Sequence, residues 1–148
     1  MKSKYTALLV HARSESFETA KIVLEELSVA PAEAQNRQDV ESHLSRVPPP
    51  HLVITVPVFP GGNWWDVLDL AAKASEKINV IVVSPTVDID LYLEVMSHGG
   101  FDFITDGFTV PELVHVLRVA LNDAARSREM PKRLSSAVQT EPSSQLAT

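Results

Sequence analysis

The chain contains no cysteine among its 148 residues. A disulfide framework, a thiol nucleophile and a cysteine-based zinc or iron–sulfur site are therefore excluded. Positive charge is also scarce, since 13 Lys and Arg stand against 19 Asp and Glu and leave a net charge of −6. Nucleic-acid binding needs a basic face, so we expect no nucleic-acid partner.

Long hydrophobic runs are missing as well. The apolar stretch at residues 7–10 is too short for a signal-peptide core, and no run approaches the roughly 20 residues that cross a bilayer. These absences predict a cytoplasmic protein with no membrane partner. Wholesale disorder is excluded too, because 45% of the residues are hydrophobic and only 22% are charged.

The composition changes near residue 128. Residues 131–148 are rich in serine and carry no helical or strand period, which is typical of a flexible tail or a linker. We therefore expect a single domain at 1–128 and a tail at 129–148.

Within the predicted domain, compact apolar runs alternate with stripes of helical spacing. The expected strands are 5–10, 31–35, 51–56, 79–84 and 101–105. Apolar strands between helices favour a parallel sheet covered on both faces. The prediction is an α/β, three-layer, flavodoxin-like (βα)5 fold with strand order 2-1-3-4-5.

Two tryptophans follow the third strand. Residues 57–62 are expected to form a loop, and Asn63 to cap the next helix. Trp65, Leu68 and Ala72 share helical spacing, which predicts that Trp65 is buried. Trp64 would then lie near the mouth of the crevice at the strand ends.

Three segments carry a resemblance to a known family. They are LVITVPVFPGG at 52–62, VIVVS at 80–84 and SHGGFDFITDGF at 97–108. Over residues 5–127 the chain resembles the receiver domain of two-component response regulators. The resemblance implies the fold and a role in phosphorelay signal transduction.

The residues that carry the chemistry of that family do not match. The acidic pair that holds Mg²⁺ corresponds to His11 and Ala12, and the acceptor aspartate to Val56. The lysine corresponds to Asp106. The switch hydroxyl and switch aromatic correspond to Ser84 and Phe103.

Valine has no nucleophile, and a hard cation needs oxygen ligands. The resemblance therefore implies a degenerate receiver, or pseudo-receiver, which acts by protein–protein interaction without phosphorylation. We expect no enzymatic activity, no metal and no cofactor.

The exchanged charges leave two interpretations open. His11 and Asp106 could form an internal ion pair, or both could face water independently. His11, Arg13 and Ser84 could instead bind an anion. A small anionic ligand or flavin binder of flavodoxin type is therefore the alternative function.

The resemblance also indicates an interface, because the fourth helix, fifth strand and fifth helix often meet partners in the family. A protein partner or a homodimer is expected on this face. The candidate residues are Tyr92, Asp102, Glu112, Val116 and Arg118.

Overall fold

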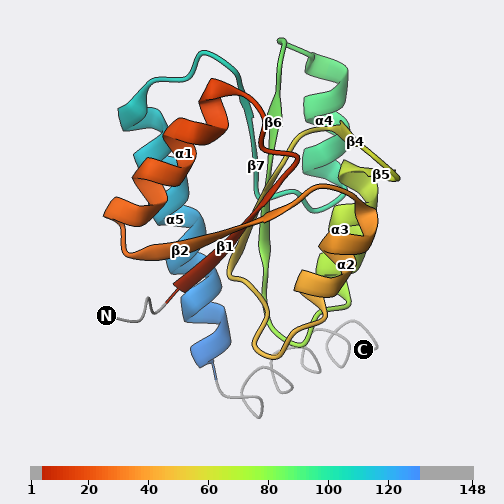
Figure 1. The fold of residues 1–148 in the computed structure, drawn as a ribbon, viewed down its shortest axis with the longest axis vertical. Helices are drawn as coiled ribbons and strands as arrows, with labels where there is room; N and C mark the ends of the chain where they lie inside the picture. The colour runs from red at the N-terminus through yellow and green to blue at the C-terminus, as the bar shows by residue number, and fades with distance from the viewer. Residues whose placement is uncertain (1–4, 131–148) are drawn as a thin grey trace, which may run out of the picture.

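A computed structural model of the chain describes residues 5–130. The main sheet contains five parallel strands, and helices cover both of its faces (Figure 1). In sheet order the strands are β2 (Val29–Ala34), β1 (Tyr5–Val10), β3 (Leu52–Thr55), β6 (Asn79–Ser84) and β7 (Asp102–Thr105). Counted along the chain, these five strands have the order 2-1-3-4-5, so the flavodoxin-like α/β prediction is confirmed.

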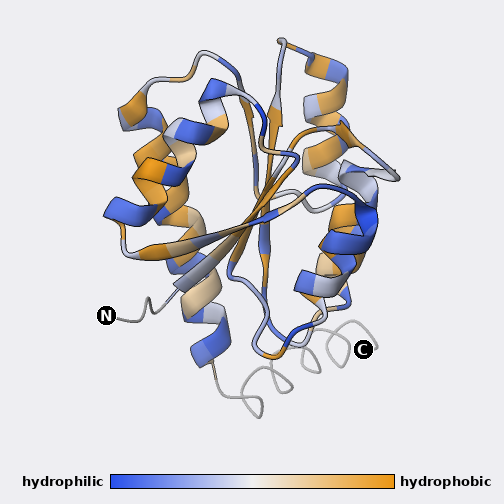
Figure 2. Ribbon diagram, viewed as in Figure 1, coloured by the Kyte–Doolittle hydropathy of each residue, from blue (hydrophilic) through white to orange (hydrophobic). Residues whose placement is uncertain are grey.

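Five helices form the outer layers. They are α1 (Glu15–Glu26), α2 (Arg37–Leu44), α3 (Trp64–Ala72), α4 (Ile89–Ser97) and α5 (Val110–Glu129). Helices α1 and α5 lie on one face of the sheet, and α2, α3 and α4 lie on the other. The apolar sides of these helices turn toward the strands (Figure 2). This arrangement leaves the carboxyl ends of the strands as the place for a site.

The loop expected at residues 57–62 contains a small hairpin instead. Strands β4 (Val58–Phe59) and β5 (Gly62–Asn63) pair antiparallel before α3 begins. Phe59 is buried in the core beneath α2 and α3, so the hairpin is fastened to the body of the domain. It forms one wall at the carboxyl end of β3.

The prediction for the two tryptophans is wrong. Trp64 is 8% exposed and packs with Val82 and Val95, whereas Trp65 is 50% exposed. The helix start is as predicted, because Asn63 caps α3 in a capping box, and the difference lies in which face of the helix is buried. The buried stripe then runs through Trp64 and Val67, and Trp65 points about 100° away from it.

The end of the fold opposite the carboxyl ends of the strands is closed by polar contacts to α5. The Asn79 side-chain amide donates to the Ala120 carbonyl at 2.8 Å and to an Asp123 carboxylate oxygen at 3.0 Å. The Arg128 guanidinium donates to the carbonyls of Pro50 at 2.6 Å and Lys77 at 2.9 Å. These bonds fasten the last turns of α5 to the loops that lead into β3 and β6.

Helix α5 continues to Glu129, one residue beyond the expected domain boundary. The rest of the predicted tail, residues 131–148, lies outside the described part of the chain. In residues 5–130 no helix has the length and apolar character required to cross a membrane.

Candidate functional site

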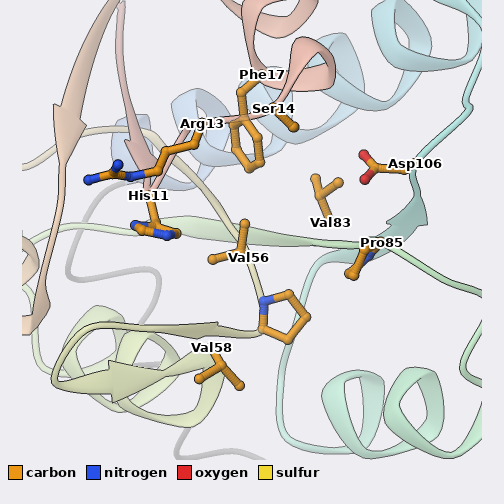
Figure 3. A pocket seen from close by; sticks show the side chains of 10 residues that line it. His11, Arg13, Ser14, Phe17, Val56, Val58, Val83, Pro85 and Asp106 are labelled. Atoms are coloured by element: carbon orange, nitrogen blue, oxygen red, sulfur yellow. The ribbon is translucent and has the colours of Figure 1, made fainter.

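A cavity of about 460 Å³ opens at the carboxyl ends of the parallel strands (Figure 3). It lies where the loops after β1, β3, β6 and β7 meet the first turn of α1. Six of its ten lining residues are apolar. The lining consists of His11, Arg13, Ser14, Phe17, Val56, Pro57, Val58, Val83, Pro85 and Asp106.

The floor of the cavity is apolar, and its rim carries both polar and apolar side chains. Phe17 from α1 is 2% exposed and Val83 from β6 is 5% exposed, so both belong to the core as well as to the cavity wall. Val58 on the hairpin is 73% exposed and stands at the rim. The cavity therefore has a hydrophobic floor and an open mouth.

His11 and Asp106 flank this floor from opposite sides (Figure 3). His11 directly follows β1, and its backbone has φ 55°, a left-handed conformation that is uncommon outside glycine. Its backbone N–H donates to Ala34 at 2.7 Å. The backbone N–H of Asp106 donates to Ser84 at 2.9 Å, which holds Asp106 beside the end of β6.

The two side chains do not form the ion pair that was one interpretation of the sequence. No ion pair in residues 5–130 joins His11 to Asp106. The reason is topological, because β3 and β6 lie between β1 and β7. Neighbouring strands are about 4.8 Å apart, so three spacings separate the two chains by about 14 Å.

Each of the two residues keeps one buried polar atom without a partner. Nδ1 of His11 and Oδ1 of Asp106 make no hydrogen bond, and they are the two such side-chain atoms in the described part of the chain. Buried polar atoms are normally hydrogen-bonded. Both exceptions therefore fall on residues that line the same cavity.

Ser84 does not contribute to the cavity. Its hydroxyl donates to the Thr86 carbonyl at 2.7 Å and accepts from the Thr86 N–H at 3.4 Å, and the residue is buried. An anion site built from His11, Arg13 and Ser84 therefore lacks one of its three groups. Ala12 is also buried and is not part of the cavity lining.

Val56 stands at the end of β3, on the floor between His11 and Asp106. The resemblance to receivers implies that Mg²⁺ would bind here, between the acidic pair and the acceptor. Asp106 is the single carboxylate among the lining residues, and the valine supplies no oxygen. Among residues 5–130 no three His, Cys, Asp or Glu side chains gather to hold a metal ion. The residues present do not fit Mg²⁺.

The candidate interface residues lie on α4, β7 and α5, away from the cavity floor. Tyr92 is partly exposed, and its ring meets Phe103 edge-on with centroids 5.8 Å apart. Asp102 accepts a hydrogen bond from the N–H of Phe103 at 2.8 Å. Val116 packs partly against the core, while Arg118 is exposed.

Glu112 completes the predicted interface set, and two further residues of α4 are exposed and apolar. Glu112 is exposed, and its N–H and carboxylate both bond the Thr109 hydroxyl at the start of α5. Ile89 and Leu93 on α4 are exposed apolar residues outside the predicted interface set. Their exposure makes this face apolar on the α4 side.

Sequence reasoning placed His11, Val56 and Asp106 at the strand ends, and the cavity unites all three. It missed Phe17 and Val58 as lining residues. Phe17 is buried on α1 and also lines the cavity. Val58 became visible only with the hairpin, for which the sequence carries no alternating strand pattern.

Several solved structures with this fold are receiver domains. The chain is 20% identical to a signal receiver domain from Vibrio parahaemolyticus, with a TM-score of 0.72, covering 82% of this chain and 92% of that one. It is 23% identical to the non-phosphorylated HemR receiver domain from Leptospira biflexa, with a TM-score of 0.67 and coverage of 80% and 94%.

A third similar structure is a response regulator receiver domain from Clostridium thermocellum. The identity is 19%, the TM-score is 0.68, and the match covers 80% of this chain and 95% of that one. No protein-family model and no curated protein matches the chain. The comparisons therefore establish the receiver fold.

Proposed function

We propose that the chain is a receiver-like interaction module of a two-component signalling system that acts without phosphorylation. The observation that carries this proposal is Val56 at the end of β3, on an apolar floor where receivers hold their acceptor aspartate. Phosphoryl transfer needs a nucleophile and neutralisation of charge. The valine supplies no nucleophile, and Asp106 adds negative charge where the family has a lysine.

The alternative of a flavin binder is less well supported. A flavin phosphate loop would need glycine and closely spaced hydroxyls after β1, but residues 11–19 contain no glycine, and several similar solved structures are receiver domains. We therefore retain the signalling function. Its cytoplasmic location, its lack of enzymatic activity and a domain boundary near residue 128 are parts of the same proposal.

The claim that the chain is not phosphorylated is tested by intact-mass measurement. The purified chain is incubated with acetyl phosphate and Mg²⁺, beside a receiver domain that has the complete acidic site. The control should gain one phosphate in its intact mass, and this chain should gain none. A stable phosphate mapped to a residue at a strand end would contradict the proposal.

The partner half concerns the face of α4, β7 and α5, which we propose binds a protein partner or a second copy of the chain. Its support is the exposed apolar pair Ile89 and Leu93 beside Tyr92. Sedimentation velocity at rising concentration separates the two cases. A homodimer on this face should be lost in Leu93→Glu and kept in Gln38→Glu, which lies on exposed α2 surface.

A further inference from the structure

The cavity above Val56 has the dimensions of a ligand site. Small-molecule sites occupy about 300–1,000 Å³ and are lined mainly by apolar side chains with a few convergent polar groups. The cavity of about 460 Å³ meets both conditions. Phe17, Val56 and Val83 give the cavity an apolar floor, which favours an apolar body.

The charged side chain in the lining determines which polar group of a ligand can bind there. Asp106 is its single carboxylate, and an ionised carboxylate can only accept hydrogen bonds. One of its oxygens is buried without a partner. Because the terminal torsion of aspartate is soft, a small rotation can turn that oxygen toward a donor in the cavity.

The side of the cavity opposite Asp106 determines how a ligand would be oriented. Arg13 and His11 stand across the floor from Asp106 (Figure 3), so a cationic head is attracted to one side and repelled from the other. The exposed Arg13 guanidinium is turned away from the floor in Figure 3, so the apolar side chains of the floor receive the body of the ligand. An aromatic body on this floor with a cationic head on the side of Asp106 therefore matches the lining.

We propose that this cavity binds a small aromatic amine, with its ring on Phe17, Val56 and Val83 and its ammonium group donating to Asp106. Charge-assisted hydrogen bonds are stronger than hydrogen bonds between neutral groups. The ammonium group therefore provides specificity, and the ring provides apolar surface that is buried on binding. This site goes beyond the proposed signalling function and does not depend on it, because the phosphorylation assay and the binding assay can fail separately.

The test uses two probes with the same ring and opposite heads. Phenethylamine and 3-phenylpropionate are titrated separately into the ¹⁵N-labelled chain, and amide shifts are followed by NMR. Phenethylamine should shift Phe17, Val83 and Asp106 saturably at millimolar concentration. The carboxylate should bind at least tenfold more weakly.

Two variants locate the binding. Asp106→Asn keeps the shape and removes the charge, so it should weaken phenethylamine at least tenfold and remove the difference between the probes. Val58→Lys places a positive charge at the exposed rim, where folding is not at risk, and should also weaken the amine. Gln38→Glu on α2 is the matched control and should change neither affinity.

Two results would overturn the proposal. If neither probe gives a saturable shift at millimolar concentration, the cavity is not a site for such molecules. If both probes bind equally and Asp106→Asn changes nothing, the cavity is an apolar hollow that does not recognise charge. Saturable binding of the amine that depends on Asp106 supports it.

Discussion

His11 and Asp106 lie on opposite sides of one cavity, and neither side chain bonds the other. The strands β3 and β6 pass between them. The two side chains are therefore separate groups rather than an ion pair. The cavity keeps its opening because nothing spans it from β1 to β7.

This separation predicts that substitutions at the two positions act independently on stability. In a double-mutant cycle of His11→Ala and Asp106→Ala, the free energies of unfolding should add to within about 0.5 kcal/mol. Urea denaturation of the four proteins measures this sum. A coupling energy above about 1 kcal/mol would show that the side chains do meet in solution.

The sheet could be predicted from the sequence because its central strands β1, β3 and β6 are runs of mostly buried, mostly apolar residues. The run Val80–Val83 has no alternation, which is typical of a strand covered on both faces, and all four residues are buried. The strand order followed from the right-handed crossovers that parallel strands require. Both features depend on the spacing of apolar residues along the chain, which can be read directly from the sequence.

The cavity could be predicted only in part. Strand ends identify His11, Val56 and Asp106, but whether two side chains touch depends on spacings between strands that are far apart in the chain. The tryptophans show a second limit. Both have apolar neighbours at helical spacing, so the spacing alone does not decide which of two faces about 100° apart turns toward the sheet.

The packing of the tryptophans predicts unequal costs for their removal. Trp64→Ala empties a buried site between Val82 and Val95 and should lower the free energy of unfolding by about 3–5 kcal/mol. Trp65→Ala removes a half-exposed ring that lies 4.1 Å, between centroids, from His98, and should cost about 1 kcal/mol. Urea denaturation measures both. Equal costs, or the reverse order, would contradict the burial of Trp64.

The two bonds of Arg128 predict that the end of α5 stabilises the domain. Arg128→Met keeps much of the apolar stem and removes the bonds to the Pro50 and Lys77 carbonyls. Hydrogen bonds to a charged group are worth about 1.5–3 kcal/mol, so we expect a loss of about 2 kcal/mol. Arg126→Met, at an exposed position on the same helix, should change stability by less than about 0.5 kcal/mol. If the two variants lose the same stability, α5 is not fastened through Arg128.

The environment of His51 predicts a dependence of stability on pH. Burial, with a smaller contribution from the Arg128 charge, lowers the pKa of His51 to about 4. Its Nδ1 faces the Thr6 N–H at 3.4 Å, and its ring meets Tyr5 edge-on at 5.0 Å. A neutral imidazole accepts that hydrogen bond and fits beside Arg128, whereas a protonated one does neither.

The sign follows from where the proton binds. In the unfolded chain His51 takes up a proton near its ordinary pKa of about 6.5, while the folded chain resists it until about pH 4. The stability from His51 is therefore complete above pH 6.5 and is lost as the pH falls from about 6.5 to about 4. A shift of this size corresponds to at most about 3 kcal/mol, and partial exposure reduces it.

His51→Gln separates this contribution from that of every other titrating group. The difference in unfolding free energy between the original chain and this variant should be constant above pH 7 and should fall by about 1–3 kcal/mol between pH 6.5 and pH 4. Arg128→Met is the matched variant, because it removes the positive charge that helps to lower the pKa of His51. The folded-state pKa of His51 should rise in this variant, so the pH range over which stability is lost should end above pH 4. Urea denaturation at a series of pH values measures all three proteins. A difference between the original chain and His51→Gln that stays constant down to pH 4 would show that the imidazole is as free to take up a proton in the folded domain as in the unfolded chain.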